Sequence, residues 1–133
     1  MESLGPILIV EDEPALCDFL AMVLGSLYSV TCVSSAEKAF QLIENSPPAV
    51  VLCDATLPRI SGLEFIERLR DNPMSSGIPV VLMSGSVEDI EEHGRAAGAA
   101  AFLSKPFHIP QILGAISNFV QRPCRAAELA SHA

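Results

Sequence analysis

Acidic, hydroxyl and basic side chains follow four separate apolar runs of this sequence. Glu11 and Asp12 come directly after the first run, Asp54 after the third, Ser84 after the fourth and Lys105 just after the fifth. In an open parallel sheet the carboxyl ends of the strands meet at one edge, and ligands bind outside that edge. The spacing therefore predicts one cleft that gathers three carboxylates, one hydroxyl and one ammonium group.

The charge balance of this cleft indicates a metal ion. Glu11, Asp12 and Asp54 would contribute about three negative charges, against about one positive charge from Lys105. Oxygen ligands without His or Cys favour a hard cation, and Mg²⁺ typically binds one or two carboxylates together with water and phosphate oxygens. We therefore expect Mg²⁺, with Mn²⁺ as a substitute.

Phosphate chemistry fits the same residues. A carboxylate can accept a phosphoryl group covalently and form an aspartyl phosphate. The cation and Lys105 would offset the charge of the transferred group, while the Ser84 hydroxyl hydrogen-bonds one of its oxygens. Catalysis in such a site consists almost entirely of positioning and electrostatics.

The elements that position these side chains follow from apolar periodicity. Continuous apolar runs predict strands that are covered on both faces, and the more alternating run at 30–33 predicts an edge strand. Apolar residues spaced i, i+3, i+4 and i+7 predict the intervening helices. The expected strands are 7–10, 30–33, 50–53, 80–83 and 101–103, and the expected helices are 16–24, 36–43, 63–69, 87–97 and 109–120. This order predicts an α/β fold of five βα units with one parallel five-stranded sheet.

Helix start signals agree with these positions. Pro14 suits the first position of a helix, and Ser-x-x-Glu patterns beginning at Ser34 and Ser61 are typical capping boxes. A weaker Ser-x-x-Asp pattern begins at Ser86. The helix at 87–97 offers few core anchors and contains an interior glycine, so we expect it to be the least stably held element.

Composition limits the class of protein. The chain has 133 residues, of which 50% are hydrophobic and 18% are charged, which is enough for one well-packed domain. A net charge of −8 argues against direct nucleic-acid binding, because such proteins neutralise phosphates with Lys and Arg. The apolar runs are far shorter than the roughly 20 residues of a membrane span, and no secretion leader opens the chain. We therefore expect a cytoplasmic protein that does not contact membranes.

The cysteines carry no metal-site or disulfide pattern. Cys17, Cys32, Cys53 and Cys124 show no C-x-x-C spacing, and two of them lie inside apolar runs. We expect small buried hydrophobic residues in a reducing compartment, rather than disulfides or zinc ligands.

Four motifs follow one another along the chain. They are Glu11-Asp12, Asp54-x-x-x-Pro58-x-x-x-Gly62, Ser84-Gly85 and Lys105-Pro106-Phe107. In this order they resemble the receiver domain of two-component response regulators. The resemblance extends over 7–121, and it implies a flavodoxin-like three-layer sandwich with strand order 2-1-3-4-5. The departures are Glu-Asp for Asp-Asp in the acidic pair, Ser for Thr at the hydroxyl and Phe for Tyr at the switch aromatic.

The resemblance assigns roles to individual residues. Asp54 would accept a phosphoryl group from a histidine kinase or a histidine phosphotransfer protein. Asp12, Asp54 and the backbone carbonyl of Thr56 would bind Mg²⁺, with Glu11 acting mainly through water. Ser84 and Lys105 would bind the phosphoryl oxygens.

Further positions match the family's aromatic switch, its cis peptide and its control of dephosphorylation. Phe102 stands at the aromatic switch position, and Lys105-Pro106 at the cis peptide. Thr56 and Ser86 stand at positions that tune dephosphorylation.

The expected function is a phosphoryl-accepting signalling switch whose phosphorylation changes a protein-interaction surface. Its only catalysis would be its own phosphorylation and slow autodephosphorylation. The expected receiver domain is 1–121, followed by a short tail, 122–133. A pseudo-receiver interaction module is one alternative. A haloacid-dehalogenase-like phosphohydrolase is another, although Thr56 stands where that family has a second Asp. A flavin or nucleotide binder is a third, although the sequence has no phosphate-binding loop.

Overall fold

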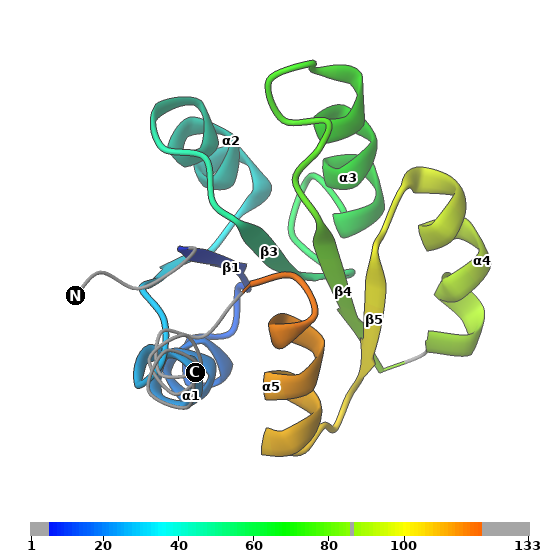
Figure 1. The fold of residues 1–133 in the computed structure, drawn as a ribbon. Coiled ribbons are helices and arrows are strands. Elements are labelled where there is room, and N and C mark those ends of the chain that lie inside the picture. The colour runs from blue at the N-terminus through cyan, green and yellow to red at the C-terminus, as the bar shows by residue number, and fades with distance from the viewer. Residues whose placement is uncertain (1–5, 86, 121–133) are drawn as a thin grey trace, which may run out of the picture.

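A five-stranded parallel sheet forms the centre of the molecule (Figure 1). The computed structural model describes residues 6–85 and 87–120. The strands lie in the order β2-β1-β3-β4-β5, which confirms the order that the resemblance implied. The strands are β1 (Ile7–Val10), β2 (Val30–Val33), β3 (Val50–Asp54), β4 (Val80–Ser84) and β5 (Ala101–Ser104).

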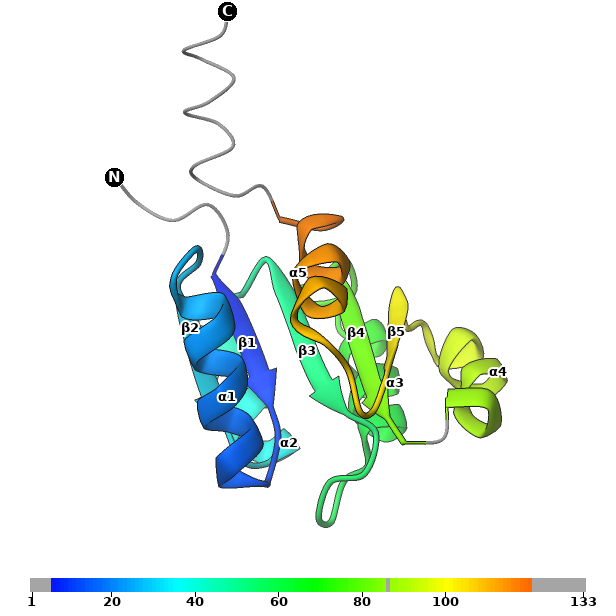
Figure 2. The same ribbon diagram turned by 90° about the horizontal axis from the view of Figure 1, so that it is seen from below.

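Helices cover both faces of the sheet. The pair α1 and α5 lies on one face, and α2, α3 and α4 lie on the other (Figures 1 and 2). Strands and helices alternate along the chain as predicted, which gives five βα units. The helices are α1 (Pro14–Gly25), α2 (Ala36–Asn45), α3 (Gly62–Asp71), α4 (Val87–Ala97) and α5 (Ile109–Ser117).

Two apolar cores lie on the two faces of the sheet. Because successive residues of a strand point to opposite faces, Leu8 and Val10 pack toward α2 and α3, whereas Ile7 and Ile9 pack toward α1 and α5. Every residue of β1 and β3 is buried, but none of β2 is fully buried. The alternating run at 30–33 therefore forms an edge strand, as the sequence predicted.

Serine caps begin two of the helices on the α2–α3 face. The Ser61 Oγ accepts a hydrogen bond from the Glu64 N–H at 3.2 Å, which confirms the predicted cap of α3. The predicted Ser34 cap of α2 is wrong by one residue, because the Ser35 Oγ accepts from the Lys38 N–H at 3.2 Å. Ser35 is the residue directly before the core-facing Ala36, so burial of the helix face sets the start of α2.

Some sequence-based expectations fall outside the described residues. These are Ser86, with the weak cap that begins there, and the tail at 122–133. Within the part of the chain that the structure describes, we find no helix long and apolar enough to cross a membrane.

Candidate functional site

The strand order brings four chain segments to one edge of the sheet. The registers pair Val10 with Cys53, Asp54 with Met83 and Ser84 with Ser104, so β1, β3, β4 and β5 end at nearly the same level. Figure 2 shows the arrowheads of the central strands pointing toward the same end of the molecule. Residues that directly follow these strands therefore meet at that edge.

Three carboxylates gather there. Carboxylate oxygens of Glu11, Asp12 and Asp54 all lie within 4.8 Å of one another. Glu11 is only 2% exposed and Asp54 only 7%, whereas Asp12 lies exposed at the mouth of the cluster. The structure thus brings together the three acidic residues that the sequence singled out.

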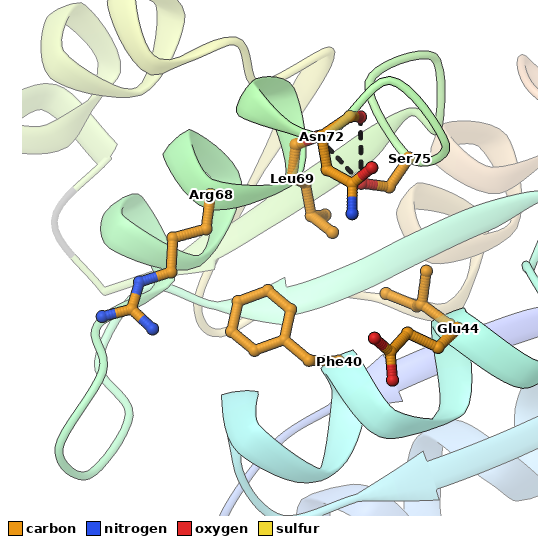
Figure 3. A pocket seen from close by; sticks show the side chains of 7 residues that line it. Phe40, Glu44, Arg68, Leu69, Asn72 and Ser75 are labelled. Atoms are coloured by element: carbon orange, nitrogen blue, oxygen red, sulfur yellow. Dashed lines mark hydrogen bonds between the residues drawn. The ribbon is translucent and has the colours of Figure 1, made fainter.

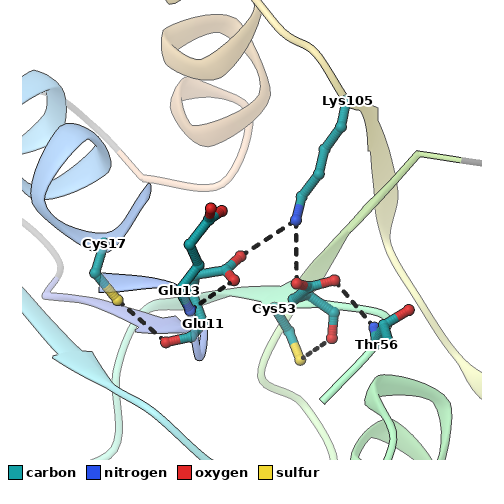
Figure 4. A network of polar contacts seen from close by, with 7 residues as sticks. Glu11, Glu13, Cys17, Cys53, Thr56 and Lys105 are labelled. Carbon is teal, nitrogen blue, oxygen red and sulfur yellow. Dashed lines mark hydrogen bonds and ion pairs between the residues drawn. The ribbon is translucent and has the colours of Figure 1, made fainter. Parts of the chain in front are cut away.

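Lys105 reaches this acidic cluster from the segment after β5. Its Nζ lies 3.0 Å from Asp54 Oδ2 and 3.4 Å from Glu11 Oε1 (Figure 4). Its backbone N–H donates to the Ser84 carbonyl at 2.8 Å, which fixes the segment against the end of β4. Burial lowers the pKa of Lys105, but the hydrogen bonds to Asp54 and Glu11 and the negative charges of these two carboxylates together outweigh burial and raise it. The ammonium therefore stays charged beside the two carboxylates.

The surroundings of Glu11 disfavour its negative charge. Burial, followed by repulsion from Asp54, raises the pKa of its carboxyl group to about 7. The Glu13 N–H, which donates to Glu11 Oε2 at 3.1 Å, and Lys105 oppose this shift only in part. Uncompensated negative charge therefore remains in an oxygen-only donor set. Such a set fits a hard cation such as Mg²⁺, and the cluster could bind a metal ion.

A backbone hydrogen bond and the start of α3 fix the position of Asp54. Its Oδ1 accepts a hydrogen bond from the Thr56 N–H at 3.0 Å, while the Thr56 side chain faces solvent. The first turn of α3 packs directly on the backbone at this point. A Cβ on Gly62 would lie 2.5 Å from the Asp54 carbonyl oxygen and 2.8 Å from Ala55 Cα. A glycine is therefore required where α3 begins.

Ser84 lies at the same edge, but Phe102 does not point into the cluster. Ser84 is half-buried at the end of β4. The ring of Phe102 packs against α4, with the Arg95 guanidinium 5.4 Å from the ring centroid. A Cβ on Gly94 would lie 2.6 Å from the ring. The sequence identified Phe102 but missed Gly94, whose lack of a side chain makes room for the Phe102 ring against α4. The contact joins two different elements, so the sequence alone does not show it.

The expectation that the cysteines are buried holds for Cys53 and is wrong for Cys17 and Cys32. Cys53 is fully buried, whereas Cys17 and Cys32 are only half-buried. The Cys17 thiol donates to the Glu11 carbonyl oxygen at 3.2 Å (Figure 4). Cys32 lies on the edge strand β2 and packs against the core on the α1–α5 face.

A second pocket lies far from the acidic cluster. It has a volume of about 260 Å³ between α2 and α3, with Phe40 and Leu69 in its wall and Glu44 and Arg68 at its sides (Figure 3). Because Leu69 and Ser75 belong to the end of α3 and the following loop, this pocket lies toward the amino ends of the strands, opposite the acidic cluster. None of the predicted site residues lines it.

The family model of the response regulator receiver domain matches residues 7–117. The chain is 29% identical over 129 residues to the DNA-binding dual master transcriptional regulator RpaA of Synechocystis, covering 95% of this chain and 53% of the regulator. It is 28% identical over 120 residues to a histidine kinase of Formosa agariphila, covering 90% of this chain and 9% of the kinase. The chain therefore spans about half or less of these curated relatives.

A solved receiver domain shows the same fold. The receiver domain of a sensor histidine kinase from Pseudomonas aeruginosa, with a magnesium ion coordinated in its active-site cleft, superposes with a TM-score of 0.79. It is 25% identical and covers 86% of this chain and 96% of that domain. The fold and the family model together define the class of protein: this chain belongs to the response regulator receiver domain family.

Proposed function

We propose that this receiver domain is switched by phosphorylation of Asp54. The observation that carries the proposal is the position of Asp54 Oδ2, 3.0 Å from the Lys105 Nζ and inside a cluster of three carboxylates. Receiver domains are phosphoryl-accepting signalling switches, and this cluster supplies both an acceptor oxygen and the charged groups around it.

The transfer itself needs little rearrangement of the chain. A carboxylate oxygen of Asp54 forms a bond to the phosphorus atom of a partner's phosphohistidine, and the phosphorus–nitrogen bond breaks. The electron pair stays on the imidazole nitrogen, and the histidine leaves as a neutral ring after proton exchange with solvent. Lys105 and Ser84 lie at the same edge and would hydrogen-bond the phosphoryl oxygens.

The metal belongs to the same proposal. Asp12, Asp54 and the Thr56 carbonyl would hold Mg²⁺ or Mn²⁺, with Glu11 acting through water. The ion would supply positive charge against the phosphoryl oxygens and the carboxylates. The buried Glu11, with its pKa of about 7, supports this assignment, because a cation would relieve the repulsion that raises its pKa.

Phosphorylation would be read out on the α4 side of the sheet. Phe102 links β5 to α4 through its contacts with Gly94 and Arg95, and Lys105 follows β5 directly. Charge added at Asp54 would move Lys105 and Ser84 and would shift the population of α4 positions. Thr56, beside the acceptor, and Ser86 would tune the lifetime of the acyl phosphate.

The partner is a histidine kinase or a histidine phosphotransfer protein, and we place the exchange in the cytoplasm. The test uses a purified phosphotransfer protein labelled on its histidine with radioactive phosphate. In Mg²⁺ the label should move to this chain, and chelation with EDTA should prevent the transfer. Transfer that is equally fast for Asp54→Asn, or equally fast in EDTA, would contradict the proposal. No transfer to the wild type at all would favour a pseudo-receiver.

A further inference from the structure

Arg70 lies where three segments of the chain meet, toward the amino ends of β4 and β5. It belongs to the last turn of α3, and its side chain is half-buried. Its Nη1 donates to the Ile78 carbonyl at 2.8 Å and to the Ser76 carbonyl at 3.2 Å. Its Nη2 and Nε both donate to the Gly98 carbonyl, at 2.8 and 3.2 Å. One side chain therefore joins the end of α3 to the loop before β4 and to the turn that follows α4.

Gly98 and Arg70 fit closely together at the carboxyl end of α4. Gly98 has a φ of 109°, in the left-handed region that favours glycine. A Cβ at Gly98 would lie 2.7 Å from the Arg70 Nε. The Ala99 N–H donates to the Gly94 carbonyl at 2.8 Å. The Gly98 N–H donates to the Arg95 carbonyl at 3.1 Å, so α4 ends in a Schellman turn, and Arg70 lies directly against that turn.

The positive charge of Arg70 suits this helix end. Carbonyls at the carboxyl end of a helix lack partners within the helix and carry partial negative charge, so a cation is stabilising there. Among the described residues, no carboxylate forms an ion pair with Arg70. Arg68 and Arg95, by contrast, each pair with a glutamate one turn earlier on their own helix. The guanidinium of Arg70 is therefore used to hold backbone segments together.

The two ends of α4 lie toward opposite ends of the strands. α4 begins at Val87, shortly after Ser84 at the carboxyl end of β4. Its 11 residues extend over roughly 16 Å, and the turn after it returns to the start of β4, where the Ala100 N–H donates to the Val80 carbonyl at 2.8 Å. A displacement of Ser84 would therefore act on the amino end of α4, whereas Arg70 holds the carboxyl end.

We propose that Arg70 is a positioning residue that fixes the carboxyl end of α4, so that α4 swings about this end when Asp54 is phosphorylated. This role rests on the proposed phosphorylation switch. The displacement is then smallest at Gly98 and largest at the amino end of α4. The first half of α4 is accordingly the part of the surface that changes most between the two states.

The first test measures amide hydrogen exchange by NMR in the unphosphorylated full chain. Arg70→Met removes the side-chain hydrogen bonds to Gly98, and it should speed exchange of the Gly98 and Ala99 amides at least about tenfold relative to the amides of β1. Arg70→Lys keeps the charge but lacks the planar fork that donates twice, so its effect should be smaller. The matched control is Arg68→Met, which removes an exposed arginine of the same helix and should leave both amides unchanged. Equal exchange in Arg70→Met and Arg68→Met would overturn the anchor.

The second test follows the same contact through the switch. The Arg70 Nε–H should show cross-relaxation to the Gly98 Cα hydrogens both before and after addition of Mg²⁺ and beryllofluoride, which mimics a phosphoryl group. In the wild type this addition should shift the amide signals of Ile90 and Glu91. In Arg70→Met the shifts should extend to Gly98 and Ala99.

Loss of the cross-relaxation in the switched wild type, or shifts in Arg70→Met that match those of the wild type, would contradict the swing about a fixed end. Circular dichroism establishes that each variant is folded, and Arg70→Lys replaces an Arg70→Met protein that is not. A wild type that does not respond to beryllofluoride contradicts the proposed function and the swing together. The exchange measurement decides the anchor in that case as well, so the two proposals can be told apart.

Discussion

Gly62→Ala should destabilise the fold by crowding the backbone behind the acceptor. The new Cβ would lie 2.5 Å from the Asp54 carbonyl oxygen and 2.8 Å from Ala55 Cα. Both atoms belong to the backbone of β3 and the residue after it, so neither can rotate away as a side chain could. Overpacking of this kind typically costs about 1–3 kcal/mol, and we expect about 2 kcal/mol here.

The comparison needs a glycine that has room for a methyl group. Gly114 lies on the exposed side of α5, and a Cβ there would meet no atom within 4 Å. Gly114→Ala should therefore stabilise the protein by about 0.5–1 kcal/mol, because alanine is the better helix former. The two substitutions are chemically identical and should change the free energy of unfolding with opposite signs.

Urea denaturation followed by circular dichroism measures both effects. The midpoint should fall for Gly62→Ala and rise for Gly114→Ala, with unchanged slopes. Gly62→Ala should also slow phosphorylation, because α3 and the Asp54 backbone cannot both keep their positions. A Gly62→Ala protein as stable as the wild type would refute the close approach of α3 to the acceptor strand.

Three further predictions concern the acidic cluster and α4. Lys105→Met removes the ammonium that lies 3.0 Å from Asp54 Oδ2, and it should slow phosphorylation by a small phosphodonor at least about tenfold. The control Lys38→Met should not slow it. Equal rates for Lys105→Met and the wild type in rapid-quench assays would exclude a role for Lys105. Because the pKa of Glu11 is about 7 when folded and near 4.5 when unfolded, the folded state binds the extra proton. The contribution of Glu11 to stability should therefore fall as the pH rises from 4.5 through 7 without metal. Urea midpoints of the wild type minus those of Glu11→Gln should show this decline, Mg²⁺ should reduce it, and a flat difference would contradict the raised pKa. Finally, amide hydrogen exchange should be faster in α4 than in β1 and β3, and equal protection would show that α4 is not the least stable element.

The sequence predicted the architecture because this fold has unusually direct signals. Strands covered on both faces give continuous apolar runs, so β1, β3 and β4 were identified to within one residue. Edge strand β2 was recognised by its alternation. The cap of α2 was misplaced by one residue, because Ser34 and Ser35 are adjacent and only the burial of the helix face selects between them.

The composition of the acidic cluster was predictable, but its energetics were not. Strand topology brings Glu11, Asp54 and Lys105 together, and their places after apolar runs were visible in the chain. The opposite exposure of neighbouring Glu11 and Asp12, and hence the raised pKa of Glu11, depends on three-dimensional packing.

The most direct test of the phosphorylation proposal is the intact mass of the chain after incubation with a small phosphodonor and Mg²⁺. The wild type should gain the mass of one phosphoryl group, and so should Asp71→Asn, in which an exposed aspartate at the end of α3 is replaced. Asp54→Asn, which keeps the shape of the side chain, should gain nothing. A wild-type mass that does not change, or an equal gain in Asp54→Asn, would contradict the assignment of Asp54 as the acceptor.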